Sequence, residues 1–325
     1  MHARIHRRDW LRAGAGLAAL ASTADVVAGD SEGDAARRES TVDARPEFRF
    51  CLNTSTIRGQ NLSLLEQIDV VTKAGYDGIE PWMRDIEAFV QGGGKLDDAR
   101  KKIADAGLVV PSAIGFASWI VDDDAKRAEG LAAARHDMEQ LAAIGGVRLA
   151  APPVGATQQA GMDLQRVAER YRALLEIGDR TGVVPELELW GFSRTLSRLG
   201  ELAFVAAECG HPGVCLLPDV YHIHKGGSDF EGLRLINGRV IHVFHMNDYP
   251  AEPTRESIQD AHRVYPGDGV APLSTILRIL HETGCRAMLS LELFNPEYWK
   301  RDAFDVARTG LEKMRTAVAK AFDGD

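Results

Sequence analysis

The sequence has few cysteines, little positive charge and no apolar run long enough for a multi-span membrane protein. Its 325 residues include four cysteines, and none of them forms a CxxC pair. The 38 Lys and Arg are outnumbered by 47 Asp and Glu, which gives a formal net charge of −9. An acidic chain of this kind is unsuited to binding a nucleic-acid backbone or an anionic membrane surface. No GxGxxG motif follows the first apolar segment, so nothing indicates a dinucleotide site.

What the chain does contain is typical of a soluble globular protein, with 45% hydrophobic and 26% charged residues. Its length suits one large α/β barrel or two average domains, and a chain this long needs no disulfide or structural metal to fold. Cys215 and Cys285 lie in or beside apolar runs, where buried free thiols are expected. A bridge between Cys209 and Cys215 remains open if the protein is exported.

The first 28 residues resemble a twin-arginine export signal. The pair Arg7-Arg8 precedes an aromatic residue and a leucine, the short apolar stretch AGAGLAALA, and small residues that offer cleavage sites after Ala21 or Ala28. A disordered tail is the alternative. Residues 29–46 are polar and lack periodicity, which is typical of a linker. We therefore predict a signal at 1–28, a linker at 29–46 and a folded domain at 47–325, in a periplasmic protein that contacts the export machinery in transit.

From residue 48 onward one pattern recurs: an amphipathic stretch, a glycine, and a short run rich in Val, Ile and Leu. The glycines suit left-handed helix ends, and the apolar runs suit strands buried on both faces. The predicted helix ends are Gly75, Gly107, Gly145, Gly182, Gly210, Gly238 and Gly284. The predicted strands lie near 48–53, 78–83, 109–115, 147–151, 183–189, 214–219, 240–246 and 287–293, and the predicted helices include 162–180, 272–283 and 298–322. Eight such units predict an α/β fold, a single-domain (β/α)₈ TIM barrel, with an open doubly wound sheet as the alternative.

Ionisable residues interrupt the ends of the last four predicted strands, which is where a barrel carries its chemistry. Charged groups in such apolar surroundings are costly unless they are paired or hold a metal ion. Three carboxylates and one imidazole suit a divalent cation, with Mn²⁺ preferred and Mg²⁺, Co²⁺ or Zn²⁺ as alternatives. Any one of these residues alone also fits a helix N-cap or a core histidine, so the prediction depends on their joint occurrence. The four are Glu188, Asp219, His245 and Glu292.

Parity along the strands separates these residues from their neighbours. Glu186 shares the parity of Glu188 but lies farther from the strand end, so Glu188 is the preferred ligand. His242 has the opposite parity to His245 and is expected to face the helices as a structural residue.

Several further residues are candidate substrate contacts. Glu80 and Trp82 follow the second predicted strand, where an N-cap acid and an apolar lid are the alternatives. Lys225 stands beside two glycines, which suits either an anionic group of the substrate or a solvated turn. Phe116 and Trp119 are candidates for stacking against a sugar ring, and the acidic run at 122–124 is expected to begin a helix.

The segments LELWGF, PDVYHIHKGGSDF, HMND, DAHRVYPGDG and LSLELFN resemble those of the xylose-isomerase-like TIM barrels, a family of sugar phosphate isomerases and epimerases. The resemblance covers roughly residues 48–322. It implies that His222 and Arg263 bind substrate. Glu188 and Glu292 come from the fifth and eighth predicted strands and can approach a substrate carbon from opposite sides, so we expect them to be the catalytic bases as well as metal ligands. The resemblance also implies the metal set Glu188, Asp219, His245 and Glu292. The loop before Arg263 is longer than in short epimerases of the family.

The motif Asp260-Ala261-His262 also resembles the D-x-H of the endonuclease IV branch of this family. That branch needs further histidine ligands at the ends of earlier strands. Here those ends read GIEPW, VVPSAIGF and VRLAAPPVG, which contain no histidine. A three-zinc nuclease site therefore cannot be assembled from them.

The leading functional hypothesis is a divalent-metal-dependent isomerase or epimerase that acts on a ketose or keto-sugar by proton transfer through an enediolate. A lyase or dehydratase acting on a keto-sugar or inosose from the same site is the alternative, because both reactions begin with removal of a proton next to a carbonyl. A non-catalytic exported sugar-binding protein and an endonuclease IV-like nuclease are the remaining alternatives. The expected partner is a small carbohydrate, with no nucleic acid, and a homo-oligomer stays open.

Overall fold

The apolar runs of the sequence form short parallel strands, and every named strand is buried over most of its length. The computed structural model describes residues 48–323, and within them two sheets run in the orders β2-β1-β7-β6 and β3-β4-β5. The strands are β1 (Arg49–Asn53), β2 (Gly78–Glu80), β3 (Arg148–Ala151), β4 (Val184–Glu188), β5 (Leu216–Leu217), β6 (Val243–Met246) and β7 (Met288–Leu291).

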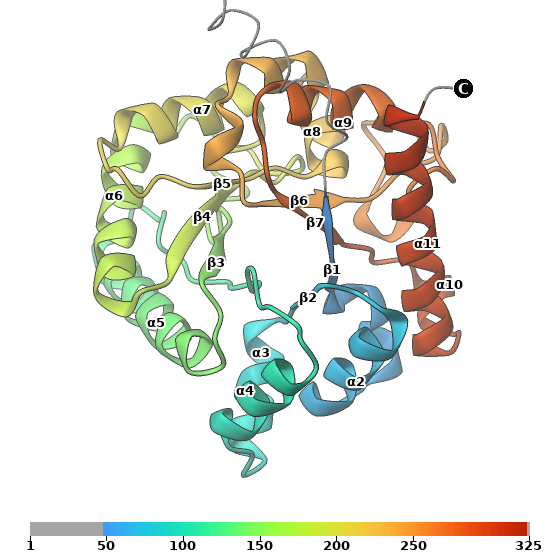
Figure 1. Ribbon diagram of the computed structural model, residues 1–325. Helices are drawn as coiled ribbons and strands as arrows, with labels where there is room; N and C mark the ends of the chain where they lie inside the picture. The colour runs from blue at the N-terminus through green and yellow to red at the C-terminus, as the bar shows by residue number, and fades with distance from the viewer. Residues whose placement is uncertain (1–47, 324–325) are drawn as a thin grey trace, which may run out of the picture. The chain divides into compact units, whose positions relative to one another are not determined.

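Isolated parallel bridges join the two sheets into a closed barrel. On one side, Leu216 of β5 pairs with Ile241 and Asp219 pairs with His245. On the other side, Val109 pairs with Gly78, and Val110 pairs with Gly146. Figure 1 shows the resulting ring of helices around the central strands. The closed parallel arrangement confirms the TIM-barrel prediction, and the open doubly wound sheet is excluded.

The third predicted strand, at 109–115, is wrong as a continuous strand. Pro111 lies in its middle and lacks the N–H that a regular ladder needs. The segment still fills its place in the barrel wall, because its backbone bonds to both neighbours: the Ile79 N–H donates to the Val109 carbonyl, and the Ala150 N–H donates to the Ala113 carbonyl. An irregular segment thus occupies the third strand position of the barrel wall.

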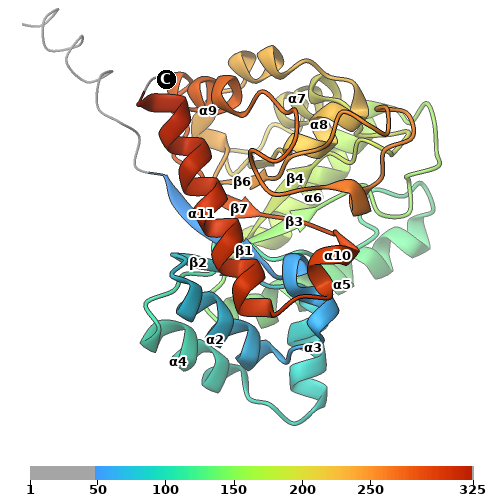
Figure 2. The same ribbon diagram turned by 90° about the vertical axis from the view of Figure 1, so that its right-hand side faces the viewer.

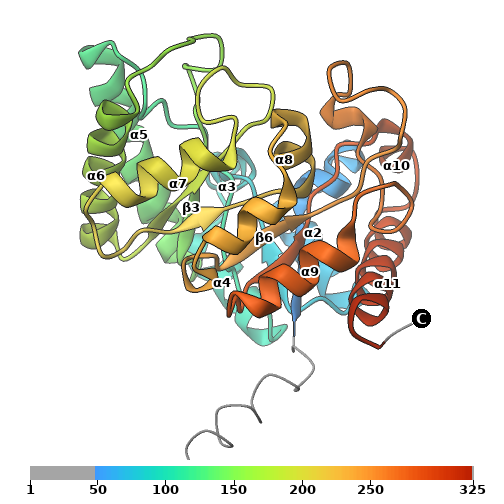
Figure 3. The same ribbon diagram turned by 90° about the horizontal axis from the view of Figure 1, so that it is seen from above.

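The helices cover the outside of the barrel in chain order (Figures 1 and 2). The last helix, α11, packs against both α2 and α9, so the first and last units of the chain meet there (Figure 3). The α-helices are α2 (Leu64–Ala74), α3 (Met83–Gln91), α4 (Leu96–Asp105), α5 (Asp124–Ala143), α6 (Leu164–Thr181), α7 (Leu199–Glu208), α8 (Val220–Gly226), α9 (Leu273–Glu282), α10 (Pro296–Trp299) and α11 (Ala303–Phe322). Short 3₁₀ helices are η1 (Thr54–Gln60), η2 (Phe230–Leu235), η3 (Gly238–Val240) and η4 (Asp260–His262).

The predicted helix boundaries follow from local chemistry. Asp123 accepts a hydrogen bond from the Lys126 N–H and caps α5, as expected for the acidic run. All the predicted helix-end glycines except Gly238 have a positive φ. Gly238 instead lies where an added Cβ would come within 2.4 Å of the Cys285 nitrogen, so this glycine permits a close approach of two chain segments.

Other expectations can be placed against the described residues. The predicted signal at 1–28 and linker at 29–46 lie outside them. All four cysteines are buried and free, so the alternative of a Cys209–Cys215 bridge is wrong. No helix among residues 48–323 is long and apolar enough to cross a membrane. His242 is exposed on the strand side away from the barrel interior, as its parity predicted.

Candidate metal centre and active-site cavity

Three of the predicted ligands meet at the carboxyl ends of neighbouring strands. Asp219 follows β5, His245 lies in β6, and Glu292 comes directly after β7. All three side chains are buried, and one ligand atom from each lies within 4.8 Å of the others. Parallel strands end at one face of the barrel, so residues far apart in the sequence converge there.

The ring of His245 is held in one orientation by carboxylates on both sides. Its Nε2 lies 3.1 Å from Oε2 of Glu80, and its Nδ1 lies 3.2 Å from Oε2 of Glu292 and 3.8 Å from Oδ2 of Asp219. Burial alone would lower the pKa of His245, but Glu292 and Glu80 raise it well above its usual value. The Nδ1 atom is buried and has no well-aligned hydrogen-bond partner. This nitrogen faces the two carboxylates, and it can bind a cation once its proton is released.

Arg263 is the buried cation of this group. Its Nη1 donates to Oε2 of Glu292 at 2.8 Å and to Oδ2 of Asp219 at 3.0 Å, while its Nη2 donates to Asp260 at 2.6 Å. The loop that carries Arg263 is anchored by an antiparallel bridge between Asp248 and Val264. The longer loop noted in the sequence thus still delivers this arginine to the barrel mouth.

The donor set fits a divalent cation. Four carboxylates are buried in this region, and Arg263, the only buried arginine or lysine among residues 48–323, contacts two of them. A buried charge without a partner is costly. Two ligand-type atoms, Nδ1 of His245 and Oε2 of Glu188, are buried without a hydrogen-bond partner. Carboxylate oxygens with one imidazole nitrogen match the ligands of Mn²⁺ or Zn²⁺ sites. The four carboxylates belong to Glu80, Glu188, Asp219 and Glu292.

The fourth predicted ligand, Glu188 at the end of β4, stands apart from the other three. Its Oε1 accepts a hydrogen bond from the indole N–H of Trp190 at 3.0 Å, and it does not belong to the group of mutually close ligand atoms. Burial raises the pKa of Glu188 well above its usual value. For Glu292 burial acts in the same direction, but His245 and Arg263 lower its pKa below the usual value. A ligand role for Glu188 stays a prediction.

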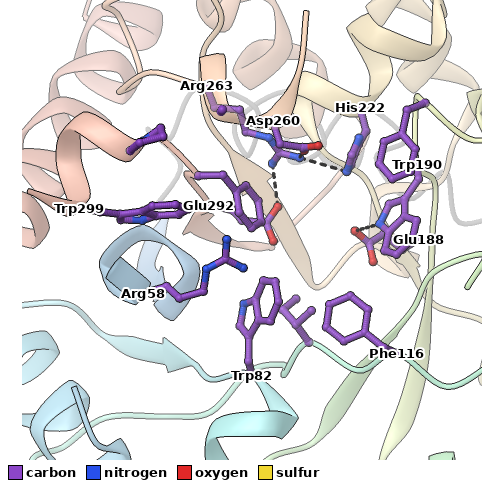
Figure 4. Close-up of a pocket in the computed structure, with 15 residues that line it drawn as sticks. Arg58, Trp82, Phe116, Glu188, Trp190, His222, Asp260, Arg263, Glu292 and Trp299 are labelled. Carbon is purple, nitrogen blue, oxygen red and sulfur yellow. Dashed lines mark hydrogen bonds and ion pairs between the residues drawn. The ribbon is translucent and has the colours of Figure 1, made fainter. Parts of the chain in front are cut away.

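Glu188 and Glu292 line opposite sides of one cavity of about 400 Å³, shown in Figure 4. His222 and Arg263 also line it, and aromatic rings form most of the remaining wall. The rings of Trp82 and Phe116 lie 5.1 Å apart between centroids. Apolar walls around a few convergent polar groups are typical of a small-molecule site. The aromatic lining consists of Trp82, Phe116, Trp190, Phe192, Phe294 and Trp299.

Both ring nitrogens of His222 have a partner within the protein, so its role as a substrate contact stays a prediction. Its Nδ1 accepts from the Gly191 N–H at 3.3 Å, and its Nε2 lies 3.1 Å from Nη2 of Arg263. Burial, with the charge of Arg263, lowers the pKa of His222 to about 4, so the ring is neutral at neutral pH. Trp82, also predicted as a substrate contact, lines the same cavity.

Three other predicted contacts lie elsewhere. Glu80 is fully buried behind His245, where Asn53 and Ser290 donate to its carboxylate at 2.9 and 2.6 Å, and it does not line the cavity. Lys225 donates from Nζ to the carbonyls of Arg255 and Glu256, so its ammonium is turned out of the cavity. Trp119 is buried between helices, with its N–H on the Pro152 carbonyl, and the predicted sugar stacking by this residue is wrong.

Several residues that line the cavity were not predicted from the sequence as substrate contacts. Trp190 and Phe294 each stand two residues after a cavity glutamate, and the repeated pattern Glu-Leu-aromatic in LELW and LELF was the available signal. Arg58 and Asp260 also line the cavity. Arg58 lies in the 3₁₀ helix η1 after β1, where no periodic pattern indicates the direction of a side chain.

The structure is a (β/α)₈ barrel with an aromatic-lined cavity at its mouth, where buried carboxylates and one histidine form a candidate metal site. The family model for xylose isomerase-like TIM barrels matches residues 68–317, and the chain belongs to that family.

Individual relatives cover most of the chain. An inosose isomerase of Bacillus velezensis is 27% identical over 287 residues, which is 85% of this chain and 99% of that protein. A 3-dehydroshikimate dehydratase of Pseudomonas putida is 22% identical over 78% of this chain and 39% of its own length. A crystal structure of IolI protein with a bound zinc atom has a TM-score of 0.78 and 24% identity, and the match covers 85% of this chain and 100% of that one.

Proposed function

We propose that the protein is a divalent-metal-dependent isomerase or epimerase of a keto-sugar or an inosose. The observation that carries this proposal is the position of two buried glutamates on opposite sides of one cavity, beside the donor group of Asp219 and His245. The inosose isomerase of Bacillus velezensis, similar over nearly its whole length, supports the reaction class.

The metal would be held by Asp219, His245 and Glu292, with Glu188 as a proposed fourth ligand. When bound, a divalent cation acts as a Lewis acid that polarises a carbonyl and makes the neighbouring C–H more acidic. Zinc is the ion in the similar IolI structure, and Mn²⁺, Mg²⁺ and Co²⁺ are the other ions that this donor set suits.

The remaining roles in the proposed reaction belong to side chains of the protein. One of the two glutamates removes the proton next to the carbonyl, and the other returns a proton to the opposite face or to the adjacent carbon. Arg263 and His222 meet at 3.1 Å on one wall and orient a substrate oxygen. The aromatic side chains exclude water and contact the apolar face of a sugar ring. Positioned acid–base catalysis of this kind contributes about 10²–10⁴ in rate.

The test is a reaction in deuterated water, followed by NMR, on a panel of inososes and keto-sugars. We expect solvent deuterium at the carbon next to the carbonyl, and we expect Glu188→Gln and Glu292→Gln each to slow that exchange about 10²–10⁴-fold. Glu186→Gln is the matched control, because Glu186 is a buried glutamate on the same strand that does not line the cavity. Product formed with complete retention of the original hydrogen would show an intramolecular hydride shift and contradict the two-glutamate assignment.

A dehydratase reaction is the second candidate, and the similar 3-dehydroshikimate dehydratase is the observation that favours it. Proton removal by the same glutamates would then be followed by loss of a leaving group on the next carbon. The NMR panel separates the two reactions, since a dehydrated product has lost one oxygen and an isomerised product has lost none.

A further inference from the structure

Arg58 is a cationic side chain that lines the cavity, and it has no role in the mechanism proposed above. It lies in η1, directly after β1, and its side chain is half-buried. Figure 4 shows the guanidinium directed into the cavity between Glu292 and Trp82. The same cavity contains Glu188 and His222, so a ligand held at the metal centre extends within the same space as this arginine.

Aromatic rings fix the position of the guanidinium without using its N–H donors. The Arg58 Cζ atom lies 4.8 Å from the ring centroid of Trp299, 5.2 Å from that of Trp82 and 5.4 Å from that of Phe294. Two of these rings are themselves held by hydrogen bonds, from Trp82 to Oδ1 of Asn53 at 2.9 Å and from Trp299 to the Ser55 carbonyl at 3.0 Å. A guanidinium that stacks on aromatic rings is held in place, and the N–H donors along its edge stay available to bind a ligand.

Arg58 forms no ion pair within residues 48–323, and the two carboxylates that attract it from a distance, those of Asp85 and Glu292, are each engaged by another arginine. No carboxylate there lies within 4.0 Å of it, and its guanidinium makes no hydrogen bond to the described part of the chain. Arg84, which lies over the same Trp82 ring at 4.8 Å, is by contrast paired with Asp85 at 3.1 Å. Glu292 is within electrostatic reach of Arg58, but Arg263 engages its carboxylate at 2.8 Å.

A partly desolvated arginine with free donors is an anion site. Burial, with the like charge of Arg84, lowers the pKa of Arg58, which means that its surroundings disfavour the cation when the cavity holds no anion. The only cations that line the cavity within the described chain are Arg58 and Arg263, and Arg263 already contacts Asp219, Asp260 and Glu292. One available guanidinium fork matches one carboxylate, whereas a phosphate dianion is usually met by several donors.

We propose that Arg58 binds a carboxylate of the substrate, so that the protein acts on acidic keto-sugars or acidic keto-polyols. This inference rests on the proposed function for the identity of the reacting end of the substrate. It also replaces Lys225, the anion contact expected from the sequence, by a residue that faces the cavity.

The test is calorimetric binding to the metal-loaded protein of three ligands that differ only at one carbon: D-fructose, D-fructuronate and D-fructose 6-phosphate. We expect the wild type to bind the uronate at least 10-fold more tightly than the other two. Arg58→Met should weaken uronate binding about 10- to 100-fold, the usual worth of a charge-assisted hydrogen bond, and change fructose binding by less than about 3-fold. Arg58→Lys should restore part of the uronate preference.

Arg135→Met is the control, because it removes an arginine of α5 that does not line the cavity and already has a carboxylate partner, Glu139, at 2.8 Å. It should leave the preference for the uronate unchanged. The proposal is wrong if the wild type shows no preference for the uronate, if the 6-phosphate binds more tightly, or if Arg58→Met weakens fructose and uronate equally.

Binding and turnover separate this inference from the proposed function. A uronate preference that depends on Arg58, in a protein that exchanges no substrate proton, would support the anion site and contradict the isomerase. Proton exchange on neutral keto-sugars without a uronate preference would support the isomerase and contradict the anion site. Thermal unfolding of each variant verifies that the measured losses come from folded protein.

Discussion

Nε2 of His245 lies 3.1 Å from the carboxylate of Glu80, on the side of the ring away from the other metal-type ligands. Glu80 is in turn fixed by the amide of Asn53 and the hydroxyl of Ser290. A carboxylate that accepts the second N–H of a ligand histidine fixes its tautomer and makes the ring a better donor. We therefore predict that Glu80 positions His245 for metal binding.

We expect Glu80→Gln to lower metal affinity about 10- to 100-fold, because the amide cannot supply the negative charge that orients His245. The measurement is metal content after equilibration in chelator-buffered solutions of the ion. Glu186→Gln, which changes another fully buried glutamate that has no contact with His245, should leave the affinity unchanged. Equal affinity in Glu80→Gln and the wild type would contradict the positioning role.

Substitutions at the barrel mouth should separate metal binding from substrate binding. We expect Asp219→Asn and His245→Ala to lose bound metal, because each removes one member of the close ligand group. His222→Gln should retain the metal, since both nitrogens of His222 already contact Gly191 and Arg263, and should lose affinity or rate instead. Mass spectrometry of the purified variants measures the metal, and its loss in His222→Gln would overturn this division of roles.

Stability should depend on pH through Asp137 on α5. Burial raises the pKa of Asp137 from 3.8 to about 6, so the folded state holds a proton that the unfolded chain releases at lower pH. Folding stability is therefore lost as pH rises from about 4 to about 6, and the full cost is present above that range. Asp137→Asn removes the charge and should stabilise the protein by about 1 kcal/mol at pH 8, after allowance for solvent screening, with no gain at pH 3.5.

Thermal unfolding at several pH values checks this expectation, and about 1 kcal/mol corresponds to roughly 2–4 °C for a domain of this size. Glu129→Gln, at an exposed position on the same helix, should give a difference from the wild type that does not change with pH. A gain in Asp137→Asn that is equal at pH 3.5 and pH 8 would show that burial of the charge is not its cause.

The barrel and the convergence of three candidate metal ligands could be predicted from the sequence itself. Glycine positions and short apolar runs are local features, and each specifies a helix end or a buried strand without reference to the rest of the chain. Once eight units close into a barrel, every strand end lies at one face, so Asp219, His245 and Glu292 had to converge. The local rule failed at Pro111, where a proline broke the strand, and at Gly238, where packing rather than φ required a glycine.

Only the tertiary structure decided which groups the side chains at and beyond the strand ends contact. Glu80 contacts His245 rather than the cavity because Asn53 and Ser290 hold it there. Glu188 stands apart from the other ligands because Trp190 donates to it, and Lys225 turns away because two distant carbonyls accept its protons. Arg58 faces the cavity beside three aromatic rings that come from two other segments of the chain, one at Trp82 and one at Phe294 and Trp299. Most of these directions depend on partners that are distant in the chain, and no periodicity in the sequence specifies them.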